Sequence, residues 1–209
     1  MSKGNKGGQW NWVQHNTCLI GSSPGLKHSS RVASFDMDDT LITRKSGAKW
    51  PKDADDWIFL NDKVSPKVKK FADDGFKVII FTNQNGIQKG HTKADDIKKK
   101  VSNIASTLGI EMQVFIATGD DEFRKPGTGM WTLLTEKFND KNKVDMKVSF
   151  YCGDAAGRKD GKHKDFSDSD YKFALNVGIP FKTPENLFLG EVDKLEVKGF
   201  NPLTVPDEG

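Results

Sequence analysis

Four short apolar runs, separated by stretches with helical character, constrain the fold of this 209-residue chain more than any other feature. The runs are Val32–Met37, Val78–Phe81, Met112–Ala117 and Val148–Cys152. Strands that alternate with helices in this way predict a parallel sheet covered by helices. We therefore expect one α/β domain, with a central parallel sheet and helices on both of its faces.

Helices are predicted between and after these runs, over residues 65–75, 92–108, 126–138 and 168–176. In the first of them Ser65 is a candidate N-cap, Pro66 suits the first turn, and Gly75 ends the segment. In the second, apolar residues recur at three- and four-residue intervals, and Thr92 with Asp95 resembles a capping box. These helices account for the segments that connect the predicted strands.

The first thirty residues lack this pattern. Met1 to Gly8 is rich in Gly, Lys and Asn, which is typical of a disordered tail, and the next twenty residues suit an irregular lead-in or short strands. No internal repeat or low-complexity linker divides the rest of the sequence. We therefore divide the chain into a tail and lead-in at residues 1–30 and a single domain at residues 31–209.

Composition excludes several classes of protein. Charged residues make up 29% and hydrophobic residues 35%, as in a soluble intracellular protein, and the net charge of +3 leaves any binding of nucleic acid to local clusters of Lys and Arg. Cys18 and Cys152 are too few for a disulfide framework or a zinc site, so we expect both to be reduced. No apolar run approaches the roughly 18 residues of a membrane span, and the N-terminus lacks a hydrophobic signal core. We expect a cytosolic or nuclear protein with no membrane partner.

Three acidic side chains, Asp36, Asp38 and Asp39, follow the first predicted strand. In open α/β sheets ligands bind outside the carboxyl ends of the strands, so these carboxylates would point into the usual crevice. Clustered carboxylates repel one another and are costly to desolvate unless a cation lies among them. Taken alone, the cluster also suits an acidic turn that caps the next element.

The other three strands end in groups that would complete such a site. Thr82 and Asn83 offer hydroxyl, amide and backbone donors for phosphate oxygens. Lys125 precedes a proline and an expected helix start, where free N–H groups and the helix dipole favour an anion. Asp154 follows the fourth strand, next to Gly153. Each feature alone suits an ordinary loop, but acid, hydroxyl, lysine and acid at four successive strand ends indicate one site.

These motifs resemble those of the haloacid dehalogenase superfamily, whose phosphatases have a Rossmann-like domain and form an aspartyl-phosphate intermediate. A closer similarity, from about Arg31 to Leu189, is to the phosphatase domain of polynucleotide kinase 3′-phosphatase. It rests on Phe81-Thr82-Asn83-Gln84, Gly86-Ile87, Arg124-Lys125-Pro126, Thr128-Gly129-Met130-Trp131, Gly153-Asp154-Ala155-Ala156-Gly157-Arg158, Asp165-Phe166-Ser167 and Phe173-Ala174-Leu175-Asn176. The resemblance implies a polynucleotide 3′-phosphatase that acts on DNA ends bearing a 3′-phosphate in strand-break repair. We expect a nuclear monomer.

The resemblance also implies catalytic roles. Asp36 would be the nucleophile, and Asp38 would protonate the departing 3′-oxygen and later accept a proton from water. Thr82 would hold phosphoryl oxygens, and Lys125 would neutralise their charge. Asp36, Asp154 and the main-chain carbonyl of Asp38 would hold Mg²⁺, which prefers oxygen ligands.

Substrate contacts are predicted for Thr40, Asn83, Lys89 and Arg124. The backbone of Asn83 would assist Thr82, and the resemblance supports contacts of Lys89 and Arg124 with phosphates farther along the strand. His91, in the same loop as Lys89, is a further candidate, and an ordinary solvated loop is the alternative for these residues. The basic stretch at residues 158–164 is a weaker candidate for the same groove. Because backbone contacts carry no base information, we expect no sequence-specific recognition.

Asp39 departs from the resemblance, since these phosphatases usually have Gly at this position. We expect Asp39 to alter the surroundings of the metal more than the type of reaction. The sequence also lacks the Gly-x-x-x-x-Gly-Lys-Ser/Thr loop of the kinase half of the bifunctional enzymes. One alternative is a small-molecule phosphatase of the same superfamily, acting on a sugar or histidinol phosphate, although the Cys and His cluster of such relatives is missing. The other is a catalytically silent module that binds DNA ends.

Overall fold

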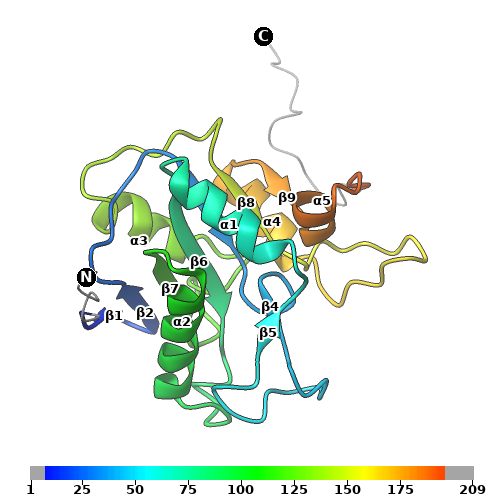
Figure 1. Ribbon diagram of the computed structural model, residues 1–209, viewed down its shortest axis with the longest axis horizontal. Helices are drawn as coiled ribbons and strands as arrows, with labels where there is room; N and C mark the ends of the chain where they lie inside the picture. The colour runs from blue at the N-terminus through cyan, green and yellow to red at the C-terminus, as the bar shows by residue number, and fades with distance from the viewer. Residues whose placement is uncertain (1–7, 196–209) are drawn as a thin grey trace, which may run out of the picture.

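The computed structural model describes residues 8–195 and has a seven-stranded sheet at its centre, in the order β1-β2-β7-β6-β3-β8-β9 (Figure 1). Parallel pairing joins β3 (Val32–Phe35), β6 (Lys77–Asn83), β7 (Gln113–Ala117), β8 (Phe150–Cys152) and β9 (Phe181–Lys182). The first four lie at the four predicted runs. The predicted α/β domain with a largely parallel sheet is therefore confirmed.

The sheet continues into the N-terminal segment. β1 (Asn11–His15) and β2 (Cys18–Ser22) form an antiparallel hairpin, and β2 pairs antiparallel with β7. Residues that the sequence suggested as a lead-in or short strands are thus strands of the same sheet. The predicted disordered tail lies outside the described residues except for Gly8, as do residues 196–209 of the predicted domain.

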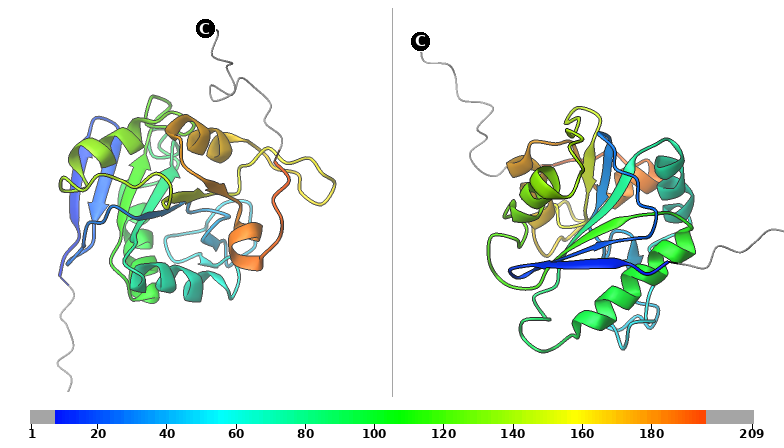
Figure 2. Two further views of the ribbon diagram at one scale, coloured as in Figure 1. Left: turned by 90° about the horizontal axis from the view of Figure 1, so that it is seen from above. Right: turned by 90° about the vertical axis from the view of Figure 1, so that its left-hand side faces the viewer.

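Helices cover both faces of the sheet (Figure 2). One face is covered by α1 (Val64–Asp73), α2 (Ala94–Leu108) and α5 (Pro184–Leu189), and the other by α3 (Gly129–Lys137) and α4 (Ser169–Val177). Each face of the sheet has its own hydrophobic core. Along β6, Ile80 faces the core under α1, α2 and α5, and Phe81 faces the core under α3 and α4, because successive side chains of a strand point to opposite faces. Burial of such side chains contributes roughly 1.5–3 kcal/mol each and holds the three layers together.

Two predicted helix caps are wrong. α1 begins one residue before Ser65, because Asn61 accepts from the backbone N–H of Lys63 and forms the turn that starts the helix. Thr92 precedes the N-cap of α2, because its N–H donates to the carbonyl of Gly86 and ties it to the loop after β6. In both cases a contact outside the helix sets the first helical residue.

A separate two-stranded sheet, β4 (Ile42–Thr43) and β5 (Ile58–Phe59), follows the acidic motif and stands at the carboxyl edge of the main sheet (Figure 1). The N–H of Leu60 donates to the carbonyl of Leu41 at 2.9 Å and joins this sheet to the body of the domain. Within residues 8–195, none of the helices combines the length and apolar character of a membrane crossing.

Candidate active site

The carboxyl ends of β3 and β8 bring two of the predicted acidic residues, Asp36 and Asp154, together. Asp36 follows β3, and its N–H donates to the carbonyl of Cys152 at the end of β8 at 2.8 Å. Asp154 follows β8. The side chains of Asp36, Asp154 and Asp170 each place a carboxylate oxygen within 4.8 Å of the others. The convergence expected from the strand ends is therefore present.

The ammonium group of Lys125 lies among these carboxylates. Its Nζ donates to Asp36 Oδ1 at 2.9 Å and to Asp170 Oδ1 at 2.8 Å, and contacts the hydroxyl of Tyr151 at 2.7 Å. Desolvation opposes the charge of this side chain, which is only 2% exposed, but Asp170 and Asp36 outweigh it and raise the pKa of Lys125 above its ordinary value. Lys125 is therefore a fixed positive charge beside Asp36.

The carboxylates themselves carry the cost of this crowding. Burial, reinforced by the charge of Asp170, raises the pKa of Asp36 well above its ordinary value, although Lys125 opposes the shift. Burial and Asp170 also raise the pKa of Asp154 to about 6. A divalent cation between Asp36 and Asp154 would favour their charged forms, and carboxylate oxygens are the ligands that Mg²⁺ prefers. The residues present therefore fit a magnesium site.

Asp170 is the residue that sequence reasoning missed. Its Oδ1 accepts from Lys125 Nζ and from the Tyr151 hydroxyl at 2.6 Å, and its Oδ2 accepts from the backbone N–H of Ala155 at 3.0 Å. With both oxygens engaged, Asp170 holds Lys125, while Asp36 and Asp154 are left to face a metal. Asp170 lies in the first turn of α4, where an acidic residue is ordinarily an exposed partner of the helix dipole, so its position gave no signal.

The packing against Asp170 explains the glycine of the Gly153-Asp154 motif. A Cβ atom on residue 153 would lie 2.4 Å from Cγ of Asp170, so a side chain there would displace the carboxylate that holds Lys125. Gly153 thus permits a close approach between the loop after β8 and the start of α4.

Gln84 belongs to one of the motifs noted in the sequence, but no role was predicted for it. It connects two predicted catalytic residues. Its Nε2 donates to Asp38 Oδ2 at 2.9 Å and to Thr82 Oγ1 at 3.0 Å. The acid that would serve the leaving group and the hydroxyl that would serve the phosphoryl group are therefore oriented by one amide.

Thr40 and Asn83, predicted to contact substrate, use their side chains to position other residues. Thr40 is fully buried, and its hydroxyl donates to Asp154 Oδ1 at 3.2 Å and accepts from the N–H of Asp154 at 3.1 Å. The amide of Asn83 accepts from the N–H of Lys125 at 2.9 Å and donates to its carbonyl at 3.1 Å. Both side chains hold the backbone of a residue that was predicted to act in the site, Asp154 or Lys125, and the backbone of Asn83 stays a candidate for contact with phosphate.

The expected helix start after Lys125 is wrong. α3 begins at Gly129, after a turn in which the N–H groups of Gly127 and Gly129 donate to the carbonyls of Arg124 and Glu122 at 2.8 and 2.9 Å. These N–H groups are satisfied within the chain. Lys125 therefore places its positive charge beside Asp36 through its own ammonium group.

Lys89 and Arg124 lie on two neighbouring loops at the carboxyl edge, after β6 and β7. The N–H of Gln88 donates to the carbonyl of Thr118 and joins these loops. Lys89 is exposed, and Arg124 Nε makes a 3.4 Å contact with Asp120 on a side chain that is 37% exposed. Both cations are therefore accessible to an anionic ligand that enters along this edge.

Asp39 has a backbone reason for its place in the motif. Its φ is +58°, in the left-handed region that glycine occupies without strain and that Asp tolerates better than most residues. Its carboxylate pairs with Arg44 Nη1 at 2.7 Å and accepts from the hydroxyl of Thr43 at 3.3 Å. Arg44 thus compensates the extra charge, which still makes a small contribution to the raised pKa of Asp154.

Comparison with known proteins agrees with this geometry. A family model described as polynucleotide kinase 3 phosphatase matches residues 31–188. The chain is 37% identical, over 88% of its length and 99% of the relative, to the uncharacterized 20.8 kDa protein in the FGF-VUBI intergenic region of Autographa californica nuclear polyhedrosis virus. It is 38% identical, over 86% of its length, to the bifunctional polynucleotide phosphatase/kinase of Schizosaccharomyces pombe, of which it spans 42%.

The fold is shared with a protein from Mesorhizobium loti described as a HAD-like phosphatase. The TM-score is 0.61 at 18% identity, over 80% of this chain and 78% of that one. This likeness confirms the predicted haloacid dehalogenase fold. The family within that fold is decided by the family model, which matches residues 31–188. The chain belongs to the polynucleotide kinase 3 phosphatase family.

Proposed function

We propose that the chain is a magnesium-dependent polynucleotide 3′-phosphatase that removes 3′-phosphate from DNA ends during strand-break repair, in the nucleus and as a monomer. The observation that carries the chemistry is the contact of Lys125 Nζ with the Asp36 carboxylate at 2.9 Å, beside Asp154. Membership of the polynucleotide kinase 3 phosphatase family supports the substrate class. A nucleophile beside a fixed cation is what attack on a phosphate dianion requires.

The site must lower the repulsion between the phosphate and Asp36 before the reaction. Lys125 supplies one positive charge, held in place by Asp170. When bound by Asp36, Asp154 and the main-chain carbonyl of Asp38, Mg²⁺ would supply further positive charge to the phosphoryl oxygens. The Thr82 hydroxyl and the backbone of Asn83 would donate hydrogen bonds to the same oxygens.

The reaction then has two displacements. A carboxylate oxygen of Asp36 attacks phosphorus, the bond to the 3′-oxygen breaks, and Asp38 donates a proton to that oxygen. Asp38, now a carboxylate held by Gln84, takes a proton from water as the water attacks the aspartyl-phosphate. The bond between phosphorus and Asp36 breaks, and inorganic phosphate and free Asp36 result.

Release of inorganic phosphate tests this proposal. Purified protein is given a 3′-phosphorylated oligonucleotide, a panel of sugar phosphates and histidinol phosphate, and an activated aryl phosphate, each with Mg²⁺ or with excess chelator. We expect Mg²⁺-dependent turnover with the highest kcat/KM on the oligonucleotide.

The alternatives give different results in the same assay. Preference for a small phosphate by more than tenfold would favour a small-molecule phosphatase. Binding of the oligonucleotide without release of phosphate from any substrate would favour a catalytically silent module.

A further inference from the structure

The loop at residues 157–167, between β8 and α4, lies directly beside the active site and projects from the body of the domain (Figure 1, yellow). Its ends are joined where the N–H of Gly157 donates to the carbonyl of Ser167 at 3.0 Å. Asp165 Oδ2 accepts from the N–H of Ala156 at 3.3 Å, two residues after the catalytic Asp154. The loop is therefore anchored to the active-site backbone.

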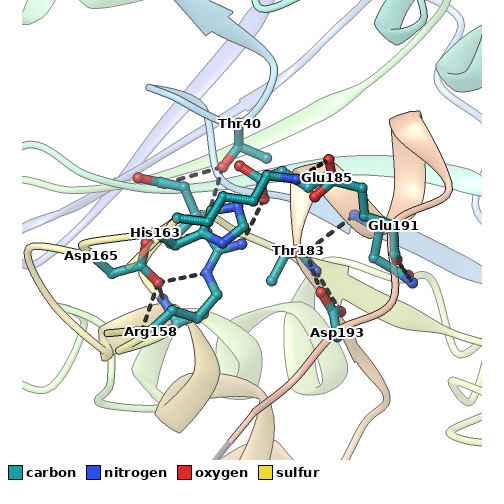
Figure 3. Close-up of polar contacts among 12 residues, drawn as sticks. Thr40, Arg158, His163, Asp165, Thr183, Glu185, Glu191 and Asp193 are labelled. Carbon is teal, nitrogen blue, oxygen red and sulfur yellow. Dashed lines mark hydrogen bonds and ion pairs between the residues drawn. The ribbon is translucent and has the colours of Figure 1, made fainter. Parts of the chain in front are cut away.

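Arg158 fixes the root of this loop. Its Nε donates to Asp165 Oδ2 at 2.8 Å and its Nη1 pairs with Glu185 Oε2 of α5 at 2.8 Å (Figure 3). The Arg158 side chain is 5% exposed, and its two carboxylate partners keep it charged. The prediction that Arg158 lines a nucleic-acid groove is wrong, because the guanidinium faces inward and its hydrogen bonds are made within the protein.

Two more basic side chains of the loop are also used internally. Lys162 Nζ pairs with Glu191 at 2.8 Å, and His163 Nδ1 lies 3.2 Å from Asp160 Oδ2. Together with the Arg158 contacts, these pairs join parts of the loop to each other and to Glu191. Three of the five basic residues of this stretch thus form contacts within the protein.

Lys159 and Lys164 remain free. Both are exposed, and within the part of the chain that the structure describes neither forms an ion pair. An antiparallel β-bridge places them directly opposite each other. Like charges at opposed positions destabilise a strand pair, and a polyanion that contacts both would relieve this repulsion.

Besides the two free lysines, the loop exposes an aromatic side chain, Phe166. Its side chain is 104% exposed, although its neighbours are fixed: Asp165 by Arg158 and Ser167 by Gly157. Contacts on both sides of Phe166 therefore anchor a backbone that presents a large apolar ring to water, two residues from Lys164. An aromatic face beside free cations is the combination that binds single-stranded nucleic acid, because every base offers a π-face for stacking.

We propose that the 157–167 loop is a subsite for the polynucleotide strand that bears the scissile phosphate. Phe166 stacks on an unpaired base of that strand, and Lys159 and Lys164 contact its backbone phosphates. The inference rests on the proposed function, and it adds that an unpaired 3′ end is preferred to a fully paired one. Stacking and phosphate contacts tolerate any sequence, so the subsite selects strand structure and not base identity.

Removal of the base tests the stacking directly. Phe166→Ala and the parent are compared on a 3′-phosphorylated single-stranded oligonucleotide, on the same oligonucleotide with abasic residues at its last four positions, and on an aryl phosphate. We expect roughly a tenfold loss of kcat/KM on the normal oligonucleotide. We expect no loss on the abasic oligonucleotide or the aryl phosphate, and Phe166→Trp should retain the parent activity. Equal losses on normal and abasic strands, or no loss on either, would overturn the proposal.

The two lysines are tested by charge. Lys159→Gln with Lys164→Gln should lower the slope of log kcat/KM against log salt concentration by about 1.4, as expected for two lost phosphate contacts to a single strand. The matched control, Lys143→Gln with Lys147→Gln, makes the same change of charge at exposed positions before β8, at the opposite edge of the sheet. An equal change of slope in both variants would show a general effect of net charge and contradict the subsite.

Binding separates failure of this inference from failure of the proposed function. Fluorescence anisotropy of a labelled 3′-hydroxyl oligonucleotide measures the subsite without any phosphate to hydrolyse. If the parent releases no phosphate from oligonucleotides but binds this probe more tightly than Phe166→Ala does, the proposed function fails and the subsite stands. If the parent is active on oligonucleotides and both proteins bind the probe equally, the subsite fails and the proposed function stands.

Discussion

Replacing Asp170 by asparagine would remove one of the two carboxylates that hold the buried ammonium group of Lys125. The lost interactions are the 2.8 Å ion pair with Lys125 and, because the amide N–H₂ would face the N–H of Ala155, the 3.0 Å hydrogen bond at Oδ2. Breaking a buried pair by removing one partner costs about 3–5 kcal/mol. Asp36 still neutralises Lys125, and repulsion among the carboxylates is relieved, so we expect a loss of about 2–3 kcal/mol in the free energy of unfolding.

Urea denaturation of metal-free protein at pH 7 measures this loss, with Asp168→Asn as the matched control. Asp168 precedes the same helix, its side chain is 44% exposed, and it pairs with Lys172, so its loss should stay below about 1 kcal/mol. The charge of Asp170 also raises the pKa of Asp36 and Asp154, so Asp170→Asn should move the acidic limb of the activity profile to lower pH. A loss no larger than that of the control, with an unchanged pH profile, would refute the role of Asp170 as the holder of Lys125.

Four further predictions concern the site. Asp36→Asn should abolish turnover while the protein stays folded by circular dichroism, and turnover within tenfold of the parent would contradict its role as nucleophile. Asp38→Asn should reduce activity much more on an alkyl than on an activated aryl phosphate, since only the alkoxide needs a proton; equal losses would argue against general acid catalysis. The folded pKa of Asp154, about 6, lies above its ordinary value of 3.8, so the folded state holds the extra proton and metal-free stability falls as pH rises between these values. The change in melting temperature caused by Asp154→Asn in metal-free protein should therefore be more favourable at pH 7 than at pH 4. The same variant should need a higher Mg²⁺ concentration for activity. A change in melting temperature that does not depend on pH would contradict this assignment. Arg124→Ala with Lys89→Ala should lower kcat/KM on a 3′-phosphorylated oligonucleotide by about 10² and on an aryl phosphate much less, whereas parallel losses would place these residues at the reacting phosphate or in the fold.

The convergence of Asp36, Thr82, Lys125 and Asp154 could be predicted because it follows from a local rule. Parallel strands end at one edge of a sheet, so residues just after each strand meet there whatever the details of packing. The strands themselves were evident because both faces of each are buried, which leaves continuous apolar runs in the sequence.

The partners that hold these residues follow no such rule. Asp170 reaches the site from a helix, and it fits there because Gly153 has no side chain to collide with its carboxylate. Gln84 contacts Asp38 because its side chain points toward the site. The same holds for Arg158, whose inward orientation depends on Glu185 of a distant helix. Contacts between segments far apart in sequence decide these roles, and residue type with spacing does not encode them.

The β1-β2 hairpin has a consequence for how the domain can be cut. The family match begins at residue 31, yet β2 covers the outer side of β7 along five residue pairs, from Cys18 with Ala117 to Ser22 with Gln113. A protein trimmed to the matched residues would expose the backbone N–H and C=O groups of β7, a buried strand with no charged residue along its length. An uncovered apolar edge of this kind recruits strands from other molecules, so the hairpin protects the phosphatase from self-association through its own sheet.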